Sequence, residues 1–137
     1  LAAKTVTDAA GSSDYFLGGV VSYANAVKED FLDVSAQTLK EEGAVSEAVA
    51  RQMAEGALAR FNADISLSFT GVAGPGGGTE EKPVGTVWMA KSSAAGTQAK
   101  CLHLILEREH IRLGAVYHGL RWLMEDWLPT YRNNTSN

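Results

Sequence analysis

The segment ISLSFT, residues 65–70, alternates apolar and hydroxyl-bearing side chains without a break. Strict alternation is the pattern of a β-strand with one apolar face. Two more β-rich segments follow it, VGTVWM at 84–89 and CLHLIL at 101–106, with a turn expected at 92–96. The segment at 101–106 is apolar on both faces, which favours a central strand. A short β-rich run, VVSY at 20–23, predicts a further strand before the alternating one.

Helical segments precede the alternating strand. Residues 1–10 are typical of the end of a helix that stops at the Gly-Ser-Ser-Asp stretch 11–14. A second helix is predicted from about 26 to 33 with Asn25 as its N-cap. A third, shorter helix is expected to run from a Ser35 cap to Gly43.

Two longer helices complete the pattern. Ser46 is a good N-cap for a central helix with one buried stripe at four-residue spacing, made of Val49, Met53, Ala57 and Phe61. Residues 108–127 predict a final helix with an apolar side made of Leu113, Val116, Leu120, Leu123, Met124 and Trp127. This order of helices and strands predicts an α/β or α+β layered domain with about four or more strands.

Length and composition agree with a single domain covering residues 1–137. The chain weighs 14.6 kDa, carries a net charge of −4, and has a sequence pI near 5.3. An acidic balance argues against a nucleic-acid binder, because duplex binding depends on clustered Lys and Arg. Cys101 is the only cysteine, so a disulfide framework is excluded. No apolar run reaches the roughly 20 residues that span a bilayer. We therefore expect a cytoplasmic protein.

The chain begins Leu1-Ala2-Ala3-Lys4, which has the character of the middle of a helix. We therefore expect a further segment upstream.

Tyr23 and Lys28 form the first candidate site. If Tyr23 ends a strand and a helix starts after it, Lys28 falls in the first helical turn. The positive end of a helix disfavours a charged lysine, so we expect a lowered pKa, as a general base requires. The alternative is a surface lysine neutralised by Glu29 and Asp30.

A glycine-rich stretch, TGVAGPGGG at 70–78, directly follows the alternating strand. Its backbone N–H groups could face a ligand at close range, because glycine has no Cβ to obstruct the approach. It lacks the Gly-Lys-Ser/Thr ending of a P-loop and the dinucleotide G-x-G-x-x-G pattern. A flexible connector is the alternative reading.

Arg108 and Arg112 lie four residues apart at the start of the last predicted helix, a suitable place for a phosphate or carboxylate. A solvated charged face with Glu–Arg pairs is the alternative. His103, His110 and His118 do not form a metal-ligand set, so we expect no metal site. Cys101, in an apolar strand, is expected to be a small buried hydrophobe.

Four stretches carry a family resemblance, and together they run through nearly the whole chain. They are AGSSDYFLGGVVSYANAVK (10–28), GAVSEAVARQMAEGA (43–57), TGVAGPGGGTEEKPVGTVW (70–88) and ERE..R (107–112). In this order they resemble the C-terminal domain of the CinA family of competence- and damage-inducible proteins. That family includes stand-alone PncC-type nicotinamide-nucleotide amidases.

The resemblance implies a three-layer α/β/α sandwich and a hydrolase of pyridine nucleotide salvage. Such an enzyme converts nicotinamide mononucleotide and water into nicotinic acid mononucleotide and ammonia, with no cofactor. The family's tyrosine and lysine fall on Tyr23 and Lys28, which would assist a serine nucleophile. The positions implied to bind substrate, with Arg108 at the 5′-phosphate, are Asn25, Thr70, Gly71, Gly74, Pro75, Gly76 and Arg108.

The family's serine lies in a Glu-Ser-Cys-Thr-Gly-Gly stretch that would fall immediately before Leu1, and the 137 residues do not contain it. The family also has Gly-Asp before its arginine, where this chain has Leu106-Glu107. The resemblance implies a small-molecule nucleotide partner and a homo-oligomer. The acidic balance and the lack of a long apolar run predict no direct contact to nucleic acid or membrane. Two alternatives to an amidase stay open, which are a non-catalytic nucleotide-binding or regulatory domain and an interaction domain.

Overall fold

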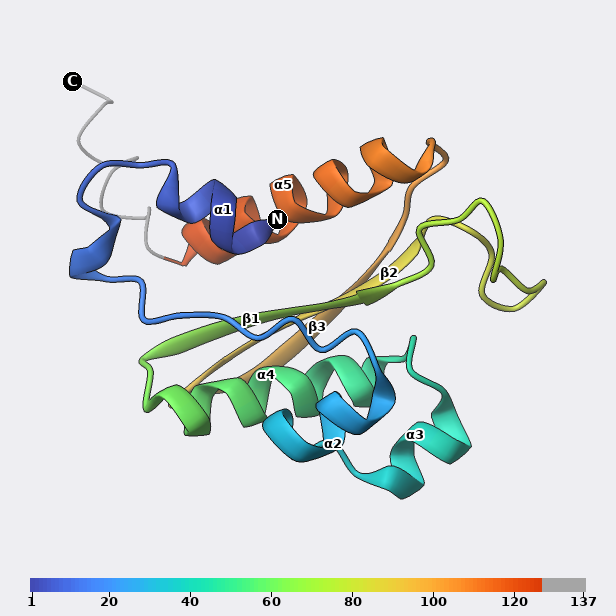
Figure 1. Cartoon of the computed structure of the whole chain (residues 1–137), viewed down its shortest axis with the longest axis horizontal. Helices are drawn as coiled ribbons and strands as arrows, with labels where there is room; N and C mark the ends of the chain where they lie inside the picture. Colours follow the sequence, from blue (N-terminus) through green and yellow to red (C-terminus); the bar gives the residue numbers. More distant parts are fainter. Residues whose placement is uncertain (127–137) are drawn as a thin grey trace.

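A three-stranded antiparallel sheet forms the centre of the computed structural model, which describes residues 1–126 (Figure 1). The strands are β1 (Ile65–Gly71), β2 (Thr86–Ser93) and β3 (Gly96–His103), in the order β1-β2-β3. Both pairs are antiparallel, and the register places Phe69 opposite Met89 and Met89 opposite Lys100. The helices α2 (Asn25–Leu32), α3 (Ala36–Glu42) and α4 (Glu47–Phe61) lie on one side of the sheet and α5 (Arg108–Glu125) on the other. The expected layering of helices on both faces is therefore present.

The alternating segment forms β1 as predicted, but both of its faces are covered. Leu67 and Phe69 pack with the buried cluster beneath α5. The hydroxyl face points to α4 instead of solvent, because each hydroxyl donates a hydrogen bond to a backbone carbonyl near or within that helix. These bonds join Ser66 to Ala54 (2.5 Å), Ser68 to Ala50 (2.6 Å) and Thr70 to Ala44 (2.7 Å).

Small residues let α4 approach the sheet closely. Ala50 and Ala54 are completely buried in a cluster with Ala90 of β2. The predicted cap is confirmed, since Ser46 Oγ accepts a hydrogen bond from the Val49 N–H. Three residues of the predicted stripe, Val49, Met53 and Ala57, pack against α2, α3 and the segment that joins them. The fourth, Phe61, is not part of this cluster and lies near Gly18 instead. One helix thus carries two buried faces and separates the sheet from two outer helices.

The outer helices begin and end close to their predicted limits. Ser35 caps α3 through its side chain and Gly43 ends it, as expected. The prediction that Asn25 is an N-cap is wrong. Asn25 is the first residue of α2, and the cap position belongs to Ala24, which has no side-chain donor or acceptor.

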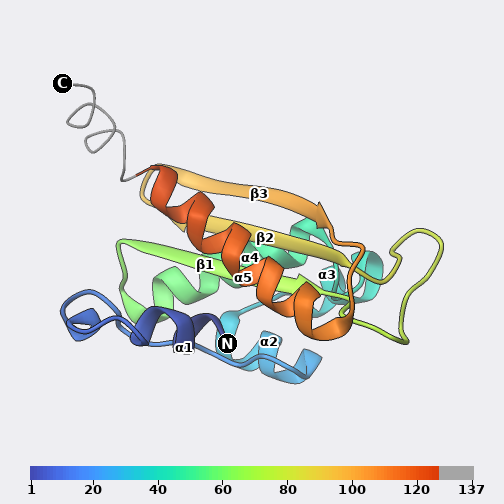
Figure 2. The same cartoon turned by 90° about the horizontal axis from the view of Figure 1, so that it is seen from above.

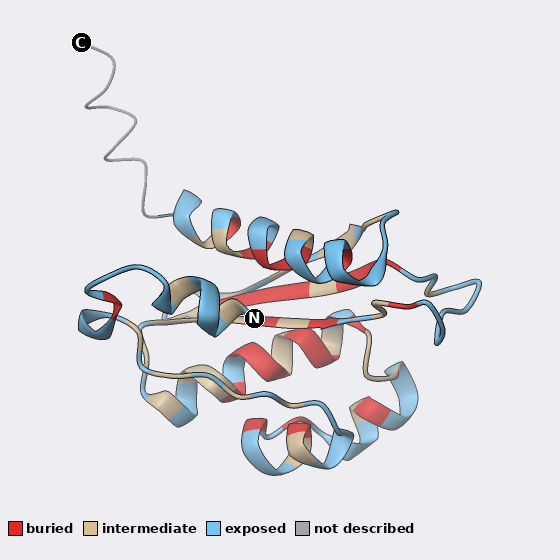
Figure 3. Ribbon diagram, turned by 45° about the horizontal axis from the view of Figure 1, so that its top comes forward, coloured by how far each residue is buried: buried red, intermediate tan, exposed pale blue. Residues whose placement is uncertain are grey.

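The buried face of α5 agrees with the predicted one only in part, since Val116 is buried as expected but other predicted residues are not. The residues buried on α5 are Ile111, Ala115, Val116, Gly119 and Trp122. Leu113 and Met124 were expected on the buried side but are about half exposed. The small residues decide the orientation, because a Cβ at Gly119 would overlap the ring of Phe69. Figure 3 shows the buried residues of α5 along its sheet-facing side. The predicted Trp127 contact lies outside the described residues.

Two strand predictions are wrong for related reasons. Residues 101–106 do not form a central strand, because β3 ends at His103 and lies at the edge of the sheet, with β2 in the middle. Residues 20–23 form no strand and pair with no other segment, so the described residues form three strands instead of four or more. Local β propensity predicts an extended backbone, whereas pairing depends on neighbours remote in the sequence.

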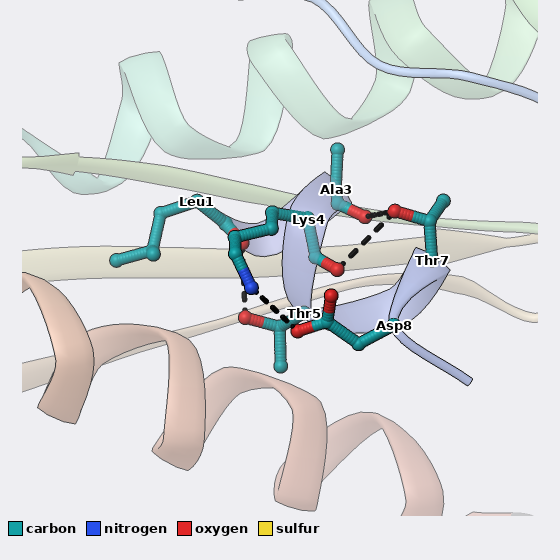
Figure 4. A network of polar contacts seen from close by, with 6 residues as sticks. All are labelled: Leu1, Ala3, Lys4, Thr5, Thr7 and Asp8. Atoms are coloured by element: carbon teal, nitrogen blue, oxygen red, sulfur yellow. Dashed lines mark hydrogen bonds and ion pairs between the residues drawn. The ribbon is translucent and has the colours of Figure 1, made fainter.

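The chain opens with α1 (Ala2–Thr7), which ends before the predicted limit at residue 10. A short 3₁₀ turn, η1 (Ser12–Asp14), follows in the stretch that was expected to end the helix. Figure 4 shows that α1 satisfies many of its polar groups locally. Thr5 and Thr7 donate to the carbonyls of Leu1 and Ala3, and Lys4 pairs with Asp8 at 2.7 Å. None of the six residues of α1 is fully buried. Among the described residues, no helix is both long and apolar enough to cross a membrane.

Candidate functional site

Several of the predicted site residues come to one end of the sheet. At this end β1 leads into the glycine-rich loop, residues 72–85, and both α2 and α5 begin there. Figures 1 and 2 agree on this arrangement, with the loop projecting beyond the ends of the strands. The first turns of α2 and α5 carry Lys28 and Arg108, respectively. The topology therefore gathers the candidate catalytic and binding positions on one side of the molecule.

Lys28 is buried at the end of the first turn of α2, with 6% of its surface exposed. Its Nζ donates to the carbonyl oxygen of Ser22 at 2.6 Å and, more weakly, to that of Tyr23 at 3.5 Å. Burial lowers the pKa of the Lys28 ammonium from its ordinary value, because desolvation penalises the charged form. The direction of the shift agrees with the sequence prediction. The cause is burial, whereas we expected the positive end of the helix.

Tyr23 and Asn25 lie beside this lysine but are open to solvent. The side chain of Tyr23 is 83% exposed, and the residue approaches Lys28 through its carbonyl, not its phenol. Asn25 is exposed at the first position of α2. Both residues are therefore accessible to a ligand at the start of α2.

Thr70 and Gly71 end β1 at the entrance to the glycine-rich loop. Thr70 is 7% exposed, and its hydroxyl donates to the Ala44 carbonyl on the α4 side. Gly71 runs close to β2, since a Cβ there would lie 2.9 Å from the carbonyl oxygen of Thr86. Thr70 thus anchors the loop through an inward-facing bond, while Gly71 is exposed and keeps the backbone accessible.

Gly74 is the buried pivot of the loop. Glycine is required here for two reasons: its φ is +73°, and a Cβ at this position would overlap the side chain of Val84. The following Pro75 and Gly76 are exposed. The backbone of these residues is therefore presented outward from a fixed buried point.

Arg108 and the loop are brought together directly. The Nη1 atom of Arg108 donates to the Gly74 carbonyl at 2.8 Å. An open groove of about 540 Å³ lies here, lined by Ala73, Pro75, Val84, Leu106, Glu107, Arg108 and Glu109. A guanidinium has five N–H donors, so the bond to Gly74 leaves others for an anion. The two glutamates make the charge of the groove mixed instead of uniformly basic.

Gly85 and Lys82 make bonds that attach the loop to the rest of the fold, and the sequence analysis missed both residues. Gly85 N–H donates to the Val72 carbonyl at 2.7 Å, and its own carbonyl accepts from the Leu104 N–H at 2.9 Å, which closes the loop onto the sheet. Its φ is +96°, and a Cβ would overlap the carbonyl oxygen of Leu104. Lys82 Nζ donates to the Glu42 carbonyl at 2.6 Å. Their partners are remote backbone atoms, which no local sequence pattern reveals.

The remaining candidate groups have a different character. Cys101 is half-buried in the edge strand, and burial raises the pKa of its thiol, which disfavours the nucleophilic thiolate. Its Sγ lies 3.7 Å from Nε2 of His103. Within residues 1–126, no three His, Cys, Asp or Glu side chains gather as a metal site would require.

Comparison with known proteins gives a consistent family. The protein-family model described as the CinA C-terminal domain matches residues 1–127 of the sequence. A CinA-like protein of Desulfotalea psychrophila is 49% identical over 130 residues, which cover 92% of this chain and 32% of the relative. The chain thus spans about a third of the length of that curated relative. The nicotinamide-nucleotide amidohydrolase PncC of Escherichia coli is 44% identical over 129 residues, which cover 92% of this chain and 77% of that enzyme.

Solved structures agree with this assignment. The competence/damage inducible protein CihA of Agrobacterium tumefaciens matches with a TM-score of 0.88 and 41% identity, over 90% of this chain and 76% of that one. The competence damage-inducible protein A of Klebsiella pneumoniae matches with a TM-score of 0.89 and 34% identity, over 93% and 80%. Sequence motifs, fold and relatives lead to one conclusion: the chain belongs to the CinA C-terminal domain family.

Proposed function

We propose that the full-length protein hydrolyses the carboxamide of a nicotinamide nucleotide, converting nicotinamide mononucleotide and water into nicotinic acid mononucleotide and ammonia. The relative named as a nicotinamide-nucleotide amidohydrolase supports hydrolase chemistry in this family. The observation that carries the proposal is Lys28, which is buried, has a lowered pKa and lies in the first turn of α2, at the glycine-rich end of the sheet.

The proposed mechanism gives Lys28 the role of general base. Neutral Lys28 removes the proton from a serine hydroxyl as the serine oxygen attacks the amide carbon. The resulting ammonium returns a proton to the departing nitrogen, which leaves as ammonia. Water then hydrolyses the acyl-serine ester and regenerates the hydroxyl. The serine would be that of the Glu-Ser-Cys-Thr-Gly-Gly stretch that the family resemblance implies, and these 137 residues do not contain this stretch.

Substrate binding is proposed for groups at the same end of the sheet as this lysine. Tyr23 and Asn25 would contact the substrate from the exposed start of α2. Arg108 would place the 5′-phosphate with the donors that its bond to Gly74 leaves free. The backbone at the end of β1 and the start of the loop is proposed to line the nucleotide site, at Thr70, Gly71, Gly74, Pro75 and Gly76. Each of these residues except Pro75 has an N–H group that could donate to the nucleotide.

The biological setting is proposed from the family. We infer a cytoplasmic homo-oligomer that acts in pyridine nucleotide salvage on a small-molecule nucleotide, without direct contact to nucleic acid or membrane. The net charge of −4 supports the exclusion of nucleic acid.

The proposal is tested by incubating the full-length protein with nicotinamide mononucleotide and measuring ammonia, without added metal or nucleoside triphosphate. Ammonia and nicotinic acid mononucleotide are expected in equal amounts. Specific mononucleotide binding in a calorimetric titration without turnover would favour the nucleotide-binding or regulatory alternative. Absence of both binding and turnover would favour an interaction domain.

A further inference from the structure

The corner between α3 and α4, residues 42–46, collects side-chain donors from three parts of the chain. The consecutive backbone carbonyls of Glu42, Gly43 and Ala44 each accept a hydrogen bond from a side chain. Lys82 Nζ binds the Glu42 oxygen at 2.6 Å, Ser46 Oγ binds Gly43 at 2.9 Å, and Thr70 Oγ1 binds Ala44 at 2.7 Å. Thr70 lies near the end of β1, just before the glycine-rich loop, and Lys82 lies near the end of that loop. One backbone corner therefore holds both ends of that loop.

Lys82 is presented to the corner by a closed turn. The Thr79 N–H donates to the Lys82 carbonyl, and the Lys82 N–H donates to Thr79 Oγ1, both at 3.0 Å. The ammonium then reaches the last carbonyl of α3, where the negative end of the helix favours a cation. Gly43 leaves room for it, because a Cβ there would lie 3.2 Å from Lys82 Nζ. The bond is charge-assisted and joins two segments 40 residues apart.

The opposite side of the loop is held from the other helical layer. Arg108 of α5 binds the carbonyl of Gly74. Pro75 and three exposed glycines lie between Gly74 and the turn at Thr79. The glycines have no side chain that could hold the backbone in place through packing or hydrogen bonds. Glycine has the largest backbone freedom to lose on ordering. The geometry of this exposed stretch thus depends on the tethers at its two sides.

We propose that Lys82 is a positioning residue, which holds residues 75–78 in their ligand-binding shape by tying the loop to the α3–α4 corner. This inference rests on the proposed function for its substrate. Lys82 contributes no atom to the chemistry. It reduces the entropy that the ligand would otherwise have to remove from the loop, so its loss weakens binding and leaves the chemical step alone.

The test compares Lys82→Met with wild type and with two matched variants in the full-length protein. Lys82→Arg keeps a charged donor and should restore wild-type behaviour. Lys40→Met removes the same charge from an exposed position on α3, without a bond to the loop, and should have no effect. The readouts are amide hydrogen exchange of residues 71–85 without ligand, and the separate KM and kcat for nicotinamide mononucleotide.

For Lys82→Met we expect about tenfold faster exchange in the loop with β2 unchanged, and a KM increase of roughly tenfold with kcat within about threefold. Unchanged exchange in residues 71–85 would overturn the tether, whether or not the protein is an amidase. A fall in kcat at constant KM would also overturn it, because it would place Lys82 in the chemistry. If wild type releases no ammonia, the proposed function fails, while the exchange experiment still decides the role of Lys82.

Discussion

Gly56 sets the position of the helix that carries Lys28, and its substitution offers a quantitative test of the packing. A Cβ built on Gly56 of α4 would overlap the carbonyl oxygen of Leu32 and lie 3.0 Å from its Cα. The clash is with the backbone at the end of α2, so no side-chain rotation can relieve it. Gly56→Ala must therefore push α2 away from α4 or strain both helices.

Two opposing terms give the magnitude. Alanine in a helix interior is more favourable than glycine by about 1 kcal/mol. Overpacking against a backbone that must shift costs about 3 kcal/mol, at the upper end of the usual range. The net loss is about 2 kcal/mol, which corresponds to a fall in Tm of about 7 °C for a chain of this length. Urea denaturation and thermal unfolding followed by circular dichroism measure both quantities.

Gly114 supplies the matched control. It lies inside α5, and a Cβ there would meet only the end of the flexible Leu104 side chain at 3.3 Å. Gly114→Ala should therefore gain about 0.5–1 kcal/mol from helix propensity alone. A Gly56→Ala protein as stable as wild type, or a matching change in both variants, would refute the close approach of α2 to α4.

Three further predictions follow from individual bonds. Burial lowers the pKa of Lys28 in the folded state. Between this lowered pKa and the ordinary value of 10.5, the folded protein binds fewer protons at this lysine than the unfolded chain does. The stability of wild type relative to Lys28→Met should therefore rise as pH increases from the lowered pKa toward about 10. A difference between the wild-type and Lys28→Met urea midpoints that shrinks over this pH range would contradict the prediction. Ser46→Ala should cost about 1 kcal/mol, more than Ser35→Ala, because the Ser46 hydroxyl both caps α4 and binds Gly43; equal losses in thermal unfolding would count against that. Ser68→Ala should cost about 1 kcal/mol through its lost bond to Ala50, and an unchanged urea midpoint would show that the bond contributes nothing.

Local chemistry explains which elements could be predicted from the sequence. The caps at Ser35 and Ser46 and the strand at 65–70 each depend on residues close together in the chain, and all three are confirmed. The face of α5 could not be read from periodicity, because the small residues Ala115 and Gly119 determine how it lies on the sheet. Apolar residues on several sides of a helix leave that orientation undetermined until the partner surface is known.

The site divides in the same way. The residue types pointed to Lys28 and to the direction of its pKa shift, but the burial that causes the shift comes from tertiary packing. The sequence predicted that Thr70 ends a strand beside the glycine-rich stretch. It did not predict the bond from Thr70 to the Ala44 carbonyl, because 26 residues separate the two. The sequence analysis did not single out Lys82, because its bond to the Glu42 carbonyl joins two segments 40 residues apart.

The most direct test of the central claim is the rate of ammonia release from nicotinamide mononucleotide by full-length Lys28→Met, measured beside wild type and Lys40→Met. Loss of a general base should lower the rate by about 10²–10⁴-fold, with the circular dichroism spectrum and mononucleotide binding retained. Lys40→Met, altered at an exposed lysine, should match wild type. Wild-type turnover in Lys28→Met would contradict the assignment of Lys28 as the base and with it the proposed mechanism.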